Sequence, residues 1–427
     1  MSFPVYTLLS LLLLSRTAYS ATPIVLFTPQ SQHILFQDWF DYITLCFAPL
    51  IAHIVGGVSS PIPVPSDSKP PSWSACLPHY NPVSVVWRWY AIADRRFRAY
   101  NWDAADMAAC NAVFWDSEKA RWDGSEEVML RSRAWLIKVP EQTHVPLLSA
   151  SSLTTVVLTL QGVQAGFIIY SSLNPDSTYH ITQGLPNVFI PIAVLGLMRL
   201  PAALWLSDDY GYLDIAQIAD DSGRNAAETS AVMTEEVGDR LLELEPRTSK
   251  RANATHTTTI VSPLSTTLSN LSEITTTDKR RLHSNHSPRG LAYRIWWFLS
   301  ITGLLSSAAV STSHLIWGNS PSFRYISLSH LLTNILYFVL SAATVLTTST
   351  YIFLGRTTST LIPCIHATWY KMFTVVLAAL GLVIVLFAAL ETRQLNNGNL
   401  STLPEFQCNK TTGFCVPVAR GHGNYNF

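Results

Sequence analysis

The sequence predicts an all-α integral membrane protein: a bundle of about six transmembrane helices after an N-terminal signal-like segment, with helical cytoplasmic loops. The chain of 427 residues is 48% hydrophobic and only 13% charged, whereas roughly a quarter of the residues in a soluble domain are charged. Its apolar residues gather in blocks of about twenty, the length that a helix needs to cross a ~30 Å hydrocarbon layer. Lysine and arginine fall almost entirely in alternate loops between these blocks.

The first element is the N-terminal segment 1–20, which has the pattern of a secretory signal. Residues 5–14 are an apolar run too short to span a membrane comfortably, and small residues (Ala18 and Ser20) flank Tyr19 as they do before a cleavage point. No lysine or arginine precedes the apolar run, so an uncleaved signal anchor is the alternative to a cleaved signal peptide. We favour cleavage, which leaves 21–41 as a short outer tail.

Two stretches of the chain hold the expected spans. The first, 42–206, contains spans at 42–58, 147–170 and 186–206, and the second, 291–391, contains spans at 295–317, 328–354 and 372–390. Prolines interrupt the span at 186–206, which a bundle tolerates where neighbouring helices satisfy the freed backbone groups. Small residues indicate close helix packing in two spans: Gly162 with Gly166, and Gly303 with Ser307 and Ser311.

The positive charges orient these spans, because lysine and arginine near span ends favour the cytoplasmic side. The loops 59–146, 207–294 and 355–371 hold 22 of the 28 such residues, and the segments 21–41, 171–185, 318–327 and 391–427 hold 4. This split places both termini outside, in the secretory pathway or at the plasma membrane. Glycosylation sequons at Asn253, Asn270 and Asn285 point the other way, but they lie in a stretch so rich in Ser and Thr that such triplets arise by chance.

The cytoplasmic loop 59–145 is unusually aromatic and basic. Its segment 85–100 (VVWRWYAIADRRFRAY) suits a helix in the headgroup layer, where aromatic rings sit well and arginines meet anionic lipid. The alternative is a small subdomain that packs these rings against itself. Asp103 is expected to cap a following helix. The mixture of basic and aromatic residues does not indicate nucleic acid, since no RNA-binding module accompanies it and net charge is zero.

The second cytoplasmic loop has two parts. Its acidic segment 207–247 contains an expected helix at 225–245, which suits either a protein partner or plain solvation, and solvation is favoured. The part at 248–290 is a Ser/Thr-rich linker, whose composition predicts disorder because it cannot bury a core.

The outer tail 392–427 carries the features of an oxidising compartment. Asn399 and Asn409 begin glycosylation sequons, and Cys408 and Cys415 are close enough in sequence to form a disulfide. The other four cysteines (Cys46, Cys76, Cys110 and Cys364) are expected to be ordinary reduced thiols.

Polar side chains inside the expected spans are the candidate functional residues, because they are costly in hydrocarbon and usually face the bundle. They are His53, Gln161, Gln164, Arg199, His314, His330 and Asn334. For each of them, hydrogen bonding between helices is a more common role than substrate contact, and Arg199 is close enough to a span end to reach the interface. No catalytic, cofactor-binding or metal-binding motif is found, so the chain is not expected to be an enzyme.

Two strings in the first half of the chain carry a resemblance. One is residues 45–57 (LCFAPLIAHIVGG), and the other is residues 80–96, which continue to WDGSEE at 122–127. They resemble predicted multi-pass membrane proteins of filamentous ascomycete fungi that have no assigned function. The resemblance covers mainly residues 40–130, and it implies a fungal membrane protein without implying an activity.

Two classes of function remain. The first is an interaction, sensing or scaffold protein that works through its cytoplasmic loops and their protein partners. The second is a transporter or channel for a small solute. We favour the first, since the two halves show no internal repeat and the spans hold no acidic residue at mid-depth to couple ions.

Overall fold

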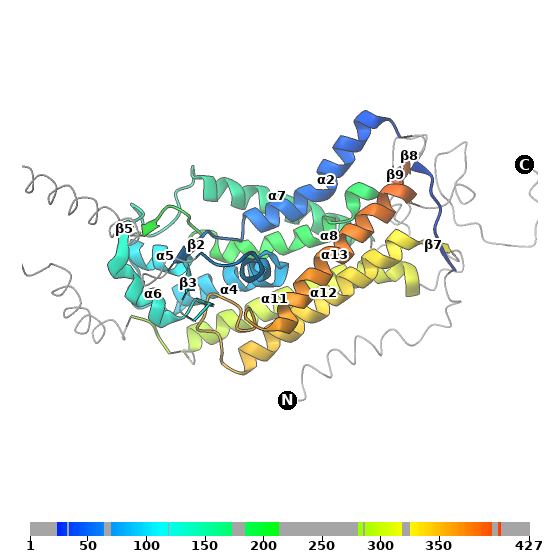
Figure 1. Cartoon of the computed structure of the whole chain (residues 1–427). Helices are drawn as coiled ribbons and strands as arrows, with labels where there is room; N and C mark the ends of the chain where they lie inside the picture. Colours follow the sequence, from blue (N-terminus) through cyan, green and yellow to red (C-terminus); the bar gives the residue numbers. More distant parts are fainter. Residues whose placement is uncertain are drawn as a thin grey trace, which may run out of the picture.

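The fold is known from a computed structural model of the whole chain, which describes residues 24–31, 34–63, 70–117, 119–172, 184–212, 281–284, 287–317, 325–394 and 400–402, the side chains of 24, 63, 172, 308–317 and 325 excepted. Long helices form its body (Figure 1). They are α2 (Phe36–Val55), α7 (Ala150–Ser172), α11 (Pro288–Trp317), α12 (Leu328–Phe353) and α13 (Thr368–Glu391). A broken helix joins them, made of η5 (Leu185–Asn187), α8 (Ile190–Ala193) and η6 (Val194–Ala202).

Five helical stretches among the described residues are long and apolar enough to cross a membrane: Phe36–Val55, Ala150–Ser171, Leu185–Ala202, Leu328–Phe353 and Thr368–Glu391. Each coincides with an expected span, although the first begins at Phe36 rather than at residue 42. The 30-residue α11 covers the remaining expected span but is not among the five. The mostly helical fold is therefore confirmed, with five helical stretches that could cross a membrane, and the count of six spans stays a prediction.

The broken helix follows from its prolines. Proline lacks a backbone N–H and its ring collides with the preceding turn of an α-helix, so Pro191 and Pro201 disfavour a continuous α-helix. The chain instead forms nine residues of 3₁₀-helix in η6, although such runs rarely exceed three or four residues. Close packing holds η6 in place, since a side chain on Gly196 would meet the backbone of Leu158 in α7.

Helix α12 buries many polar side chains and exposes large apolar ones. In α12 the buried residues include Ser, Thr, His and Asn side chains, whereas Phe338 and Phe353 are more than half exposed. Large exposed apolar residues also cover one side of α7 and the first turns of α2. The first turns of α2 project beyond the other helices in Figure 1. An apolar exterior around a partly polar interior is the distribution that lipid favours.

Short elements gather at the two ends of the bundle (Figure 1). We name the larger group, residues 56–145, 203–212, 281–290 and 355–367, the polar end. It contains helices α3 (Trp73–Cys76), η2 (Leu77–Tyr80), α4 (Pro82–Arg98), α5 (Ala104–Asn111), α6 (Glu126–Ser132) and η3 (Arg133–Trp135). Its strands are β2 (Pro61–Pro63), β3 (Val113–Asp116) and β4 (Arg121–Asp123) in one sheet, and β5 (Leu136–Lys138) paired with β6 (Gly211–Tyr212).

The opposite end joins residues 24–35, 184–185, 325–328 and 391–402. Strand β1 (Ile24–Leu26) pairs in parallel with β7 (Tyr325–Ser327), and β8 (Arg393–Gln394) pairs with β9 (Leu400–Ser401). The buried carboxylate of Glu391 accepts hydrogen bonds from the backbone N–H groups of Leu328 and Ser329 at the start of α12. These strands of two to four residues are an addition to the all-α architecture expected from the sequence.

The glycines of the bundle give a first test of the packing. Changing Gly196 to Ala places a Cβ 2.6 Å from the Leu158 carbonyl oxygen, and we expect this overpacking to destabilise the protein by about 1–3 kcal/mol. Gly166 in α7 has no atom within 4 Å of an added Cβ, so Gly166→Ala should stabilise the helix by up to about 1 kcal/mol. Thermal unfolding of the purified protein in detergent measures both. Equal effects of the two changes would contradict the described packing of α7 on η6.

Candidate functional site

The candidate site is built around α4, the helix at the centre of the polar end. Asn81 begins it by accepting a hydrogen bond from the Val83 N–H at 3.0 Å, and Pro82 occupies the first helical position, where a missing N–H costs nothing. Fifteen of its 17 residues are buried, including Trp87, Trp89 and Tyr90. The headgroup-layer interpretation of 85–100 is therefore wrong for most of this helix. Its aromatic rings pack inside the protein, as the alternative interpretation expected.

Burial of α4 takes three of its arginines out of water, and the terminal nitrogens of each donate to acceptors within the protein, whereas the Nε atoms of Arg88 and Arg95 have no partner among the described residues. Arg88 donates to the carbonyl oxygens of Gly57 at 2.8 Å and Asn111 at 2.7 Å. Gly57 lies just after the last turn of α2, whose carbonyl groups carry partial negative charge. Arg88 thereby joins the end of the first span to α5.

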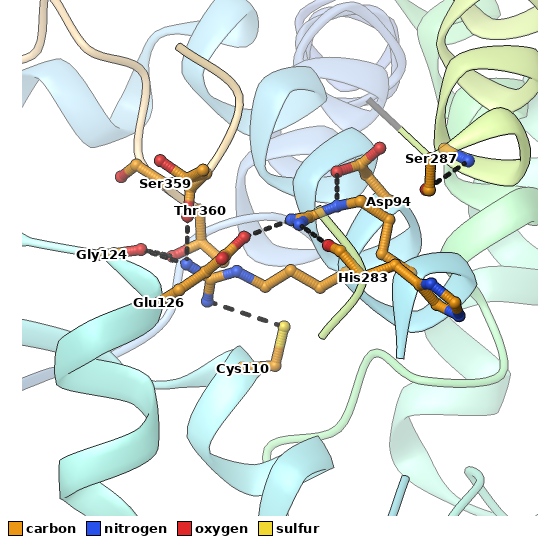
Figure 2. A network of polar contacts seen from close by, with 12 residues as sticks. Asp94, Cys110, Gly124, Glu126, His283, Ser287, Ser359 and Thr360 are labelled. Carbon is orange, nitrogen blue, oxygen red and sulfur yellow. Dashed lines mark hydrogen bonds and ion pairs between the residues drawn. The ribbon is translucent and has the colours of Figure 1, made fainter. Parts of the chain in front are cut away.

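Arg95 joins two further segments to α4 and also contacts α5. One of its terminal nitrogens donates to the carbonyl oxygens of Gly124, before α6, and Thr358, in the loop between α12 and α13. The other lies 3.9 Å from the sulfur of Cys110 (Figure 2). Burial raises the pKa of the Cys110 thiol despite this neighbouring cation, so the thiol stays protonated and is not an activated nucleophile.

Arg98 and Asp94 form the charged core of the site. The buried carboxylate of Asp94 accepts from Arg98 at 2.8 Å and from Arg294 of α11 at 2.9 Å. Arg98 also pairs with Glu126 and donates to the His283 carbonyl oxygen, so three segments converge on one guanidinium group (Figure 2). Burial favours a lower pKa for Arg98, but the carboxylates of Asp94 and Glu126 outweigh it and raise that pKa.

A second ion-pair cluster holds the segment that leads into α11. Asp103 and Asp106 form the predicted helix start as a capping box, each side chain accepting from the other's backbone N–H. Both carboxylates also accept from Arg133 and Arg281 at 2.6–3.1 Å. Leu282 pairs with Ala99 as an isolated β-bridge. Residues 281–283 are thus fixed against the end of α4.

Two of the polar residues expected inside the spans come together. The Arg199 guanidinium donates to the Gly56 carbonyl oxygen and to the Thr155 hydroxyl, and lies 5.8 Å from the Trp89 ring. The His53 ring is fully buried, and its centre lies 5.1 Å from the centre of the same Trp89 ring. Arg199 is only 4% exposed. It therefore caps the end of α2 and does not extend to the interface.

The remaining polar candidates lie elsewhere. Buried Asn334 donates to the His330 carbonyl oxygen within α12, near the opposite end. Gln161 is partly buried, and Gln164 is exposed on the outer side of α7. His314 is in α11, but its side chain is outside the described part. Among the described residues, these side chains do not gather around one common site.

The remaining expectations concern the cysteines, metal binding and segments that lie outside the described residues. Cys46, Cys76, Cys110 and Cys364 are free thiols, as expected. The acidic segment beyond residue 212, most of the linker 248–290, the sequons at Asn399 and Asn409 and the pair Cys408 and Cys415 lie outside the described residues. Within the described ranges, no group of three or more His, Cys, Asp or Glu side chains is placed to hold a metal ion.

Comparison of the chain with protein-family models, with curated proteins and with solved structures found no match.

The Asp94 core can be tested against a surface pair of the same chemistry. Asp94→Asn leaves two buried guanidinium groups without their shared carboxylate, and we expect a loss of about 3–5 kcal/mol of stability. Asp209 pairs with Lys138 where both side chains are more than half exposed, so Asp209→Asn should cost less than about 1 kcal/mol. Thermal and denaturant unfolding of both variants measures the difference. An Asp94→Asn protein as stable as the Asp209→Asn protein would show that the buried pairs are not formed.

Proposed function

We propose that the protein is a six-span membrane protein with both termini outside, whose polar end faces the cytoplasm and acts as an interaction or scaffold platform for protein partners. The observation that supports this role most is the construction of the polar end. Three expected cytoplasmic loops are bound to one buried helix, α4, by its arginines. Arg88 and Arg95 donate to carbonyl oxygens at 111, 124 and 358, and Arg98 donates to the carbonyl oxygen of His283. A folded platform of this kind presents a fixed surface.

The outward side of α6 is the working surface that we assign to this platform. Glu127 and Arg131 are exposed there, one helical turn apart. Neither makes a side-chain hydrogen bond or ion pair with the residues that the structure describes. Paired charges of opposite sign on a rigid helix suit recognition of a partner by charge complementarity.

Transport is the alternative that the intramembrane polar residues would support if they lined one path. Among the described residues they occupy separate places: His53 with Arg199 near the polar end, and His330 with Asn334 near the opposite end. The guanidinium of Arg199 is engaged by a backbone carbonyl and a hydroxyl. This arrangement favours helix packing over a solute path.

The proposed orientation is tested by glycosylation reporters placed after residue 427 and, in a separate protein, within 248–290. We expect modification only of the first, because the positive loops should be retained in the cytoplasm. In the same preparation, Asn409 should carry a glycan, and Cys408 and Cys415 should resist alkylation as a disulfide. Modification of the reporter within 248–290 but not of the one after residue 427 would contradict the proposed orientation and support the opposite one.

The platform role is tested by proximity labelling with a biotinylating enzyme inserted within 248–290. We expect the paired change Glu127→Lys and Arg131→Glu to reduce the biotin labelling of at least one specific neighbouring protein about tenfold. The reason is that the charge reversal places like charges opposite those of the partner. Gln394→Glu, an exposed change at the opposite end, is the matched control and should leave the neighbours unchanged. The platform role would be contradicted if the wild type, the double variant and the control labelled the same neighbours to the same extent. If the purified protein also carried a solute across proteoliposome membranes, transport would be the function instead.

A further inference from the structure

Helix α4 leaves one narrow side uncovered at its last turn. Only Arg96 and Phe97 escape full burial within the helix, and Tyr100 follows them at the surface. Phe97 is 41% exposed and Tyr100 64%. Of the four arginines in segment 85–100, three are enclosed by protein, and Arg96 alone faces outward.

The Arg96 side chain has an unusual environment. Its guanidinium carbon lies 5.6 Å from the centre of the Trp102 ring and 5.6 Å from the centre of a Trp205 ring. It makes no hydrogen bond or ion pair with any residue that the structure describes, and its Nε is buried without a partner. Arg88, Arg95, Arg98 and Arg294 of the same region all donate to carbonyl or carboxylate oxygens. The two indoles therefore contact the Arg96 guanidinium without accepting its N–H groups, which are left for another molecule.

The position of this group coincides with the junction between the spans and the polar end. Trp205 lies three residues after the candidate span that ends at Ala202. The Val145 N–H donates to the Leu204 carbonyl oxygen at 2.8 Å, which places the approach to α7 beside it. Phe97 packs 4.9 Å from Tyr293, in the second turn of α11. Exposed apolar side chains surround the junction: Leu147, Leu148, Leu204 and Trp296.

Tryptophan and tyrosine at span ends mark the level of the lipid headgroups. An arginine fork at that level matches two oxygens of one phosphate group, and it binds them by charge-assisted hydrogen bonds. The cytoplasmic leaflet carries the anionic lipids. We infer that Arg96, held between Trp102 and Trp205, binds the phosphate of an anionic phospholipid in the leaflet beside the polar end. The inference rests on the proposed membrane orientation only for which leaflet supplies the lipid.

The experiment uses the full-length protein purified in a neutral detergent and titrated with short-chain phosphatidylserine. Native mass spectrometry measures the dissociation constant of the first bound lipid. We expect Arg96→Gln to raise it about tenfold, because the bidentate contact is lost. Arg121→Gln removes an equal charge from an exposed arginine of β4, so this matched control should bind as the wild type does.

Two further variants and two further ligands complete the test. Arg96→Lys keeps the charge without the planar fork and should bind with intermediate affinity. Trp205→Phe keeps an aromatic ring and should weaken binding less than Arg96→Gln does. Phosphatidylcholine should bind more weakly than phosphatidylserine, and soluble glycerol phosphate at the same concentrations should not compete. Thermal unfolding of each variant shows that it is folded.

Equal affinity of the wild type and Arg96→Gln for phosphatidylserine would overturn the inference, as would equal losses of affinity in Arg96→Gln and Arg121→Gln. Competition by glycerol phosphate would also overturn it, since the site would then accept a free anion. The glycosylation reporters distinguish failure of the lipid site from failure of the proposed membrane orientation. If the reporter within 248–290 were modified and Arg96→Gln still weakened lipid binding, the binding site would stand, but its lipid would come from the outer leaflet.

Discussion

The buried carboxylate of Asp94, shared between Arg98 of its own helix and Arg294 of α11, is the interaction on which the polar end depends. Removing charges from water costs several kcal/mol for each ion unless a partner compensates it. Helix α4 carries three arginines inward, so every one of them must reach an acceptor. The acceptors are a carboxylate of the helix itself and the carbonyl groups of segments as distant as Gly57 and Thr358. Satisfying the arginines therefore fixes where those segments lie, and the loops fold onto the bundle instead of hanging from it.

The spans could be predicted from the sequence because lipid imposes a simple rule on it. An apolar block of about twenty residues has few alternatives to a transmembrane helix, and α12, expected at 328–354, is found at Leu328–Phe353. The interpretation of segment 85–100 as a helix in the headgroup layer, made from its aromatic and basic residues, was wrong for most of the helix. Its alternation of aromatic and basic residues is equally typical of an interfacial helix and of a buried one, since both surround arginine with rings. What decides between them is whether acceptors for the arginines exist elsewhere in the fold, and the spacing of residues in one segment does not contain that information.

The candidate site shows the same limit. Arg199 stands out in the sequence as a lone charge within an apolar block, and the structure engages it with Gly56 and Thr155, far from it along the chain. Asp94, Glu126 and Glu391 gave no signal. Asp94 is one acidic residue in a basic run, and its partner Arg294 is 200 residues away. Glu391 directly follows the last expected span, 372–390, and it caps the first turn of α12. Pairings of this kind arise from the topology, so they can be recognised only after the helices are placed.

The two ends of the bundle are held by different means, and this difference bears on how the molecule can respond to its surroundings. At the opposite end, short strand pairs and the Glu391 cap join neighbouring elements mainly through the backbone. At the polar end, side chains of one helix connect α2, α5, α6, α11 and the loop before α13. Helix η6 also belongs to this network, because Arg199 donates to the same turn at the end of α2 that Arg88 reaches. A 3₁₀-helix has poorer hydrogen-bond geometry than an α-helix, so its conformation depends more on such external contacts. The contacts of α4 and η6 therefore join the ends of α2 and α11 in one network. Under the proposed scaffold role, this network would hold the polar end in a fixed position on the bundle, which separately folded loops would not do.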